Sequence, residues 1–184
     1  HKKIKNQQAT KKTEMRQTWT LWTLGRIAID QVKSDQVFEQ LLARENPGND
    51  AKVFNQRLQA IRILAFRARE ANGSRPLPVS VINALHDSDS RIRFEAVQAV
   101  MQARQHQHVP QLLDVLAMER DPAIVYITWK TLQRLCAVEE LRNFQTDTRD
   151  AVRRGALLAL LETHSLSESD VRAVLKDRNE DNRA

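Results

Sequence analysis

Residues 85–100 read LHDSDSRIRFEAVQAV, and this stretch decides the fold. After an acidic turn, one stripe of apolar side chains runs along it, formed by Ile92, Ala96, Ala99, Val100 and Ala103. Their spacings of four, three, one and three residues are those of one face of an α-helix. Small side chains on that face let a second helix approach closely. The stretch therefore predicts a helix that packs along a small-residue face.

The same stripe recurs in both directions along the chain. Towards the C-terminus its copies are Ile124, Thr128, Thr131, Leu132 and Leu135, and then Val152, Ala156, Ala159, Leu160 and Thr163. Less regular copies on the N-terminal side are Ala60, Ile63 and Leu64, and before them Thr20, Thr23, Leu24 and Ile27. Successive copies lie 40, 36, 32 and 28 residues apart. A helical stripe that returns at such intervals is typical of a solenoid.

Shorter amphipathic segments separate these inner helices, at 37–42, 79–85, 109–116, 138–144 and 171–175. Helix-start signals agree with this division. Asp121 followed by Pro122 is typical of a cap and first helical position, and Ser165 with Glu168 has capping-box spacing. The sequence predicts an all-α fold, a right-handed α-solenoid of about five helix pairs.

The stretch at 85–100 resembles the HEAT-repeat signature, in which acidic turn residues precede an apolar residue, an arginine and a small-residue helix. Val152 and Arg153, followed by Ala156 and Ala159, match it again, whereas Val125 replaces the arginine in the copy between them. The short spacings are similar to those of compact, bilin-lyase-type HEAT-like proteins. The resemblance covers residues 13–184 and implies partner binding, with no shared reaction. Because the signature restarts at 175–184, we expect this array to be a segment of a longer polypeptide.

Charge is concentrated at the N-terminal end. The formal net charge is +6, and five lysines of the basic tail at 1–12 account for +5 of it: Lys2, Lys3, Lys5, Lys11 and Lys12. The other 172 residues carry 24 basic and 23 acidic side chains, a net charge of +1. A nearly neutral body does not favour a nucleic-acid partner.

Several function classes lack the residues that they need. Cys136 is the only cysteine, which excludes an internal disulfide and a site with several cysteine ligands. Two histidines, His106 and His108, without an expected cysteine or carboxylate beside them, are too few for zinc, so we expect neither metal nor cofactor. No nucleophile elbow, P-loop, dinucleotide fingerprint or zincin motif occurs, and no apolar stretch is long enough to span a membrane.

Arginines return at one position of the repeat, as Arg57, Arg93, Arg153 and Arg183, close to acidic turn residues such as Asp89 and Asp150. We favour a structural ladder in which each arginine bonds to turn carboxylates and carbonyls and stiffens the stack. The alternative is a groove lined by arginines that binds phosphate or carboxylate groups.

Tryptophans suggest a second alternative. HEAT-like DNA glycosylases use tryptophans and an acid in a cleft to engage a damaged nucleotide, and Trp19, Trp22 and Trp129 lie on helices of the array. We favour core or inter-repeat packing for them. The candidate binding residues are therefore Trp19, Trp22, Trp129, Arg93 and Arg153, and no catalytic acid is identified.

The sequence thus favours a non-catalytic scaffold that binds a protein partner, or a neighbouring domain of the same chain, on the surface of its inner helices. Nucleic-acid binding, including a glycosylase-type activity, is the alternative. Residues 20–27 also resemble the opening repeat of HEAT regions in large bacterial proteins that join a dehydrogenase to a c-type cytochrome. The haem-attachment motif is absent from this sequence.

The tail should bind polyanions without specificity. We expect that deleting residues 1–12 removes most of the weak, steeply salt-dependent binding to duplex DNA, because five of the six net charges go with it. The measurement is fluorescence anisotropy across a salt series. Salt-resistant binding by the shortened chain would contradict this expectation.

Overall fold

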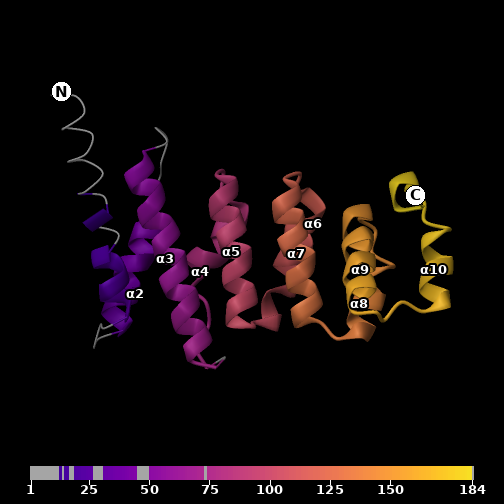
Figure 1. The fold of residues 1–184 in the computed structure, drawn as a ribbon, viewed down its shortest axis with the longest axis horizontal. Helices are drawn as coiled ribbons and strands as arrows, with labels where there is room; N and C mark the ends of the chain where they lie inside the picture. Colours follow the sequence, from indigo (N-terminus) through magenta and orange to yellow (C-terminus); the bar gives the residue numbers. More distant parts are fainter. Residues whose placement is uncertain are drawn as a thin grey trace.

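The computed structural model describes residues 13, 15–16, 19–26, 31–44, 50–72 and 74–183, and every regular element in these residues is helical. Figure 1 shows the elements following one another in a row. Residues 19–26 are helical. The later elements are α2 (Gln31–Leu42), α3 (Ala51–Glu70), α4 (Val79–Asn83), η1 (Ala84–His86), α5 (Ser90–Ala103), η2 (His106–His108), α6 (Val109–Met118), α7 (Pro122–Leu135), α8 (Val138–Phe144), α9 (Asp150–Glu162), α10 (Glu168–Val174) and α11 (Glu180–Arg183).

Inner helices α3, α5, α7 and α9 pack on one another in chain order, each on the next (Figure 1). Shorter outer helices alternate with them, and α2 packs on α3, α6 on α7 and α8 on α9. The predicted all-α solenoid of helix pairs is confirmed. Helix α6 also contacts α9, so this outer helix packs against two successive inner helices, α7 and α9.

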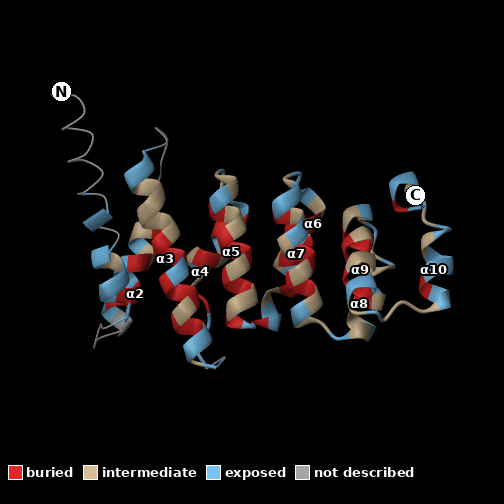
Figure 2. Cartoon of the chain, in the orientation of Figure 1, coloured by how far each residue is buried: buried red, intermediate tan, exposed pale blue. Residues whose placement is uncertain are grey.

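The predicted small-residue stripe is the buried seam between inner helices. Ala96, Ala99, Ala156 and Ala159 are each at most 1% exposed. Buried positions of α5, α7 and α9 lie along the sides that face neighbouring helices (Figure 2). Thr128 fits the same seam because its hydroxyl donates to the carbonyl of Ile124 at 2.6 Å and leaves no polar group unpaired.

Gly155 is a seam residue that the predicted stripe does not include. A Cβ atom at this position would collide with the Leu116 side chain of α6. Leu116 is 1% exposed and its neighbours leave it little room to move. The glycine therefore lets α6 lie directly against α9.

The stripe predicted for the first helix is wrong in register. Thr20, Thr23 and Leu24 are exposed, and Ile27 lies outside the described residues. Gly25 is the residue that faces the core instead, because a Cβ there would stand 2.6 Å from Cγ2 of Ile63. Gly25 and Leu21, four residues before it, therefore form the face of this helix that packs on the core.

Arg67 of α3 fastens the first helices to the rest of the array. Its Nε and Nη2 donate to the carbonyl of Gly25 at 3.0 and 2.8 Å, and its Nη1 donates to Ser34 at 2.8 Å and pairs with Asp35. Burial lowers the pKa of this guanidinium. A buried charge with this many partners is a fixed structural link.

Helix starts follow the predicted chemistry with one correction. Asp121 caps α7 by accepting from the N–H of Ala123 at 2.9 Å, and Pro122 follows at the first helical position. The last capping box lies two residues later than the spacing indicated. Ser167 and Asp170 form it at the start of α10, since this pair satisfies both backbone N–H groups.

Arginines of the repeated position bind acids on the loop before the next inner helix. Arg93 grips Glu119 with two bonds of 2.7 and 3.1 Å, and Arg153 grips Asp177 with two bonds of 2.7 Å. Arg57 pairs with Asp87 in the same way. Each acid also accepts from a backbone N–H two residues ahead, so it closes its own turn. The bonds join neighbouring repeats as well as stabilising loops.

Arg93 and Arg153 also donate to two carbonyls of their own loops. Arg93 reaches the carbonyls of Asp87 and Ser88 at 2.9 and 3.1 Å. Arg153 reaches those of Asp147 and Thr148 at 2.9 and 3.2 Å. Arg183 donates to the carbonyl of Asp177 in the corresponding way.

Two acids expected in the ladder have other roles. Asp89 caps α5 and pairs with Arg91, and Asp150 accepts from the side chain of Asn179. Asp89 and Asp150 lie two and three residues after the turn acids Asp87 and Asp147, and their side chains do not meet the repeated arginines. The ladder is interrupted at Val125, and Asp147 binds Arg149 there, with two bonds of 2.9 Å. Arg149 also donates to Asp114 of α6 at 2.7 Å, and this bond between repeats takes the place of the one that an arginine at position 125 would make.

None of the helices in the described part of the chain combines the length and apolar character that crossing a bilayer requires.

We predict that Ala99→Leu lowers the free energy of unfolding by about 1–3 kcal/mol, because the seam has no room for three added carbons. Thermal or urea unfolding measures it. Ala173→Leu, the same change at an exposed position of α10, is the control and should have little effect. Equal stability of Ala99→Leu and the parent chain would contradict the packing.

The ladder should also make stability depend on pH. Hydrogen bonds from Arg93 lower the pKa of Glu119 from 4.5 to about 2. A carboxylate with a lowered folded-state pKa stabilises the fold above its unfolded pKa and loses that contribution as the pH falls towards 2. Glu119→Gln should therefore cost about 1–3 kcal/mol at pH 7.

The cost of Glu119→Gln should shrink progressively in urea titrations between pH 5 and pH 2. Glu139→Gln is the control, because Glu139 is 81% exposed and its contact with Arg142 is long, at 3.7 Å, and therefore weak. If the Glu119→Gln variant stayed less stable than the parent chain by the same free energy of unfolding at every pH, the result would contradict the ladder.

Candidate functional site

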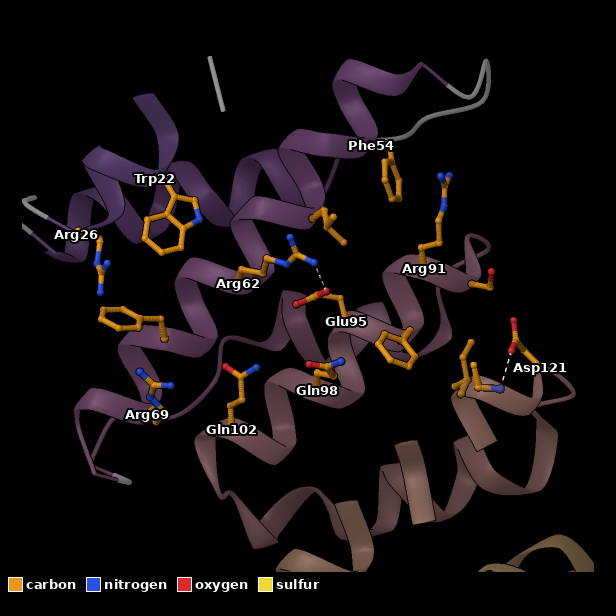
Figure 3. Close-up of a pocket in the computed structure, with 16 residues that line it drawn as sticks. Trp22, Arg26, Phe54, Arg62, Arg69, Arg91, Glu95, Gln98, Gln102 and Asp121 are labelled. Carbon is orange, nitrogen blue, oxygen red and sulfur yellow. Dashed lines mark hydrogen bonds and ion pairs between the residues drawn. The ribbon is translucent and has the colours of Figure 1, made fainter. Parts of the chain in front are cut away.

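A cleft of about 800 Å³ runs across successive inner helices on the side away from the outer ones (Figure 3). It begins at Trp22 in the first helix, crosses α3 and α5, and ends at the first turn of α7. One wall is a stripe of α3 formed by Phe54, Leu58, Arg62, Phe66 and Arg69. Spacings of four, four, four and three place these side chains on one helix face. Helix α3 thus has a second apolar face besides its buried one.

The walls combine aromatic rings with guanidinium groups. Arg26 lies 4.8 Å from the ring centre of Trp22 and 4.9 Å from that of Phe66, and Arg69 lies 5.2 Å from Phe66. Arg91 of α5 lies 3.7 Å from the ring centre of Phe54 across the cleft. These stacks hold planar side chains in fixed positions on both walls.

The floor is polar. Glu95 of α5 is buried and accepts from Arg62 of α3 at 3.0 Å, so the ion pair bridges the two walls. Gln98 and Gln102 follow on the same face of α5 and are half-buried. Neither amide has a hydrogen-bond partner in the described part of the chain. Each offers a donor and an acceptor to a bound molecule.

A second depression of about 350 Å³ adjoins the cleft beside Trp19 and Trp22. Gln59 lines it and is only 9% exposed, and its Oε1 atom lacks a hydrogen-bond partner. This oxygen is closed to solvent, so it does not itself face the depression. The two indole rings make the depression suitable for an apolar side chain.

The five candidate binding residues are not gathered in one place. Trp22 lines the cleft and the depression, and Trp19 lines the depression with 67% of its surface exposed. Neither side chain is therefore buried in the core. Trp129 is 8% exposed and lies edge-on to Tyr126, with ring centres 5.1 Å apart. It is a packing residue and lines neither depression.

Arg93 and Arg153 do not reach the cleft either. Both are held in the ladder by two bonds to a carboxylate and two to carbonyls. The cleft is built instead from aromatic residues, arginines and glutamines that lie outside the repeated stripe. The available signal was the stripe at 54, 58, 62 and 66, which is too apolar for a solvated helix face.

Two carboxylates border the cleft. Glu95 is paired with Arg62, and Asp121 accepts from the N–H of Ala123 as the cap of α7. Both therefore already have structural partners.

The absence of ligands near His106 was a wrong expectation. Cys136, at the end of α7, and Glu140, in α8, come within 4.8 Å of His106 through their ligand atoms. His106 Nε2 lies 2.7 Å from Glu140 Oε2. Burial, with smaller effects of the Glu140 charge and hydrogen bond, raises the pKa of the Cys136 thiol to about 12. His108 is not part of this group, and burial lowers its pKa.

Comparison with known proteins adds little. No family model and no curated protein matches this chain. Among solved structures it is similar to the X-ray structure of the Escherichia coli protein YibA, with 16% sequence identity and a TM-score of 0.45. The likeness covers 89% of this chain and 66% of that one, so the chain spans about two thirds of the length of YibA. The solenoid fold therefore rests on the packing of this chain's own helices.

Proposed function

We propose that this protein is a non-catalytic binding scaffold whose cleft holds an extended segment of another protein or of a neighbouring domain of the same polypeptide. The observation that carries the proposal is the aromatic and arginine-lined cleft with two uncommitted glutamine amides on its floor. The HEAT-like repeat pattern of the sequence supports the same role.

Dimensions support an extended peptide. Inner helices that pack about 9 Å apart make four neighbours span about 27 Å. That is the length of about eight residues of extended chain. Backbone groups of such a segment would meet Gln98 and Gln102, and an apolar side chain would suit the depression beside Trp19 and Trp22.

Charge supports a segment that is acidic as well as apolar. Four arginines border the cleft, against the carboxylates of Glu95 and Asp121. Aromatic rings beside the arginines would contact apolar side chains of the same segment. An acidic side chain would pair with Arg26, because Arg62, Arg69 and Arg91 already have carboxylate partners in Glu95, Glu70 and Asp89.

A nucleic-acid partner is less well supported. Arg62 and Arg91 are already paired with Glu95 and Asp89, so a phosphate backbone would have to compete with fixed carboxylates. A glycosylase-type reaction would require an acid that is free to act on substrate, and the two acids of the cleft have structural partners.

The test is selection of peptides from a random display library with the full chain. We expect the selected peptides to combine acidic with aromatic or aliphatic residues. Gln98→Ala combined with Gln102→Ala should weaken binding about tenfold, since losing one or two hydrogen bonds costs about 1–2 kcal/mol. Trp22→Ala should weaken it as well.

Gln133→Ala is the matched control, because it removes a glutamine amide from α7 outside the cleft. Circular dichroism and thermal unfolding would verify that all variants keep the fold. A library that yields no cleft-dependent peptide would refute the proposal. So would tight binding of single-stranded DNA that depends on Arg26, Arg62 and Arg69.

A further inference from the structure

His106, Cys136 and Glu140 come together where η2 meets the turn between α7 and α8. We propose that these three side chains form a Zn²⁺ site with a water molecule as fourth ligand. The site is independent of the cleft and of its partner, since none of the three residues lines the cleft.

Geometry supports a four-coordinate ion. The three ligand atoms lie within 4.8 Å of one another, and the shortest pair, His106 Nε2 and Glu140 Oε2, is 2.7 Å apart. Tetrahedral zinc with bonds of about 2.0–2.3 Å keeps its ligand atoms about 3.3–3.8 Å apart. Each pair therefore needs to move by only about 1 Å.

The side chains have the freedom for that movement. His106 is 57% exposed and Glu140 is 30% exposed, so both can rotate. Cys136 is half-buried at the end of α7 and supplies the fixed point of the site. Metal binding replaces the thiol proton, which passes to solvent.

The donor set selects the metal. Thiolate sulfur and imidazole nitrogen favour zinc over magnesium and calcium, which prefer oxygen ligands. Three protein ligands with one position left for water are typical of zinc sites that are accessible to solvent. Without metal, Glu140 pairs with His106 and accepts a hydrogen bond from the Cys136 thiol, and a bound ion would replace both contacts.

The ion would also connect two repeats. His106 belongs to η2, before outer helix α6, and Glu140 belongs to the next outer helix, α8. A bound ion would therefore fasten successive outer helices, and binding to the folded state alone raises the melting temperature.

The experiment uses the full chain, reduced and freed of metal with a chelator, and titrates it with Co²⁺ and then Zn²⁺. Cys136 is the only cysteine, so a thiolate-to-cobalt charge-transfer band reports on this site alone. Histidines elsewhere, at 1, 86, 108 and 164, cannot produce that band. We expect the band to saturate at one equivalent, visible bands of tetrahedral intensity, loss of both on adding Zn²⁺, and a higher melting temperature with Zn²⁺.

Variants assign the ligands. Cys136→Ser should abolish the charge-transfer band, and His106→Gln and Glu140→Gln should each weaken cobalt affinity by about tenfold or more. His86→Gln, at an exposed histidine outside the group, should leave the titration unchanged. If Cys136→Ser fails to fold, the variants at the two exposed ligands still decide the question.

Two outcomes would overturn the site. One is a folded parent chain that gives no thiolate band with excess Co²⁺. The other is a band of full affinity in both His106→Gln and Glu140→Gln, which would mean that the cysteine binds metal without them.

Discussion

Close approach of the inner helices is the constraint on which the rest of this structure depends. The helices meet at Ala96, Ala99, Ala156 and Ala159, all almost completely buried, and Gly155 lets α6 contact α9 as well. Side chains this small bring helix axes near enough for an arginine on one repeat to reach an acid on the next. The ladder of Arg93 with Glu119 and Arg153 with Asp177 is therefore a consequence of the seam, which it then reinforces.

Much of the fold follows from the sequence because its information is local. Residues of one helix face, such as Ile92, Ala96 and Ala99, recur at helical spacing and report burial directly. A helix whose packing depends on a missing side chain is harder to predict. Gly25 faces the core by contact with Ile63, and only Leu21, one turn earlier, is an apolar residue of the same helix that packs on the core.

Sites between repeats lie beyond this local information. The cleft needs Phe54 and Arg91 to stack across two helices, and the proposed zinc site needs His106 beside a residue 30 positions later. Both depend on the angle and distance between neighbouring repeats, which the spacing of apolar residues does not encode. The sequence predicts that turn acids pair with the repeated arginines, but not which acid of each turn does so. Asp87 and Asp89 look equivalent in sequence, and only Asp87 faces Arg57.

Stacking and binding share the same helices, and this has a physical consequence for the cleft. Each cleft wall is the exposed face of a helix whose opposite faces are fixed in the seam, as for Gln98, which lies between the buried residues Val97 and Ala99. Glu95 connects the two walls through Arg62, and the aromatic rings are held by arginines on both sides. Such a cleft is rigid before a partner arrives, so little conformational entropy is lost on its side when the complex forms. Most of the conformational entropy lost on binding is then that of the bound segment, so the sequence of that segment determines the affinity.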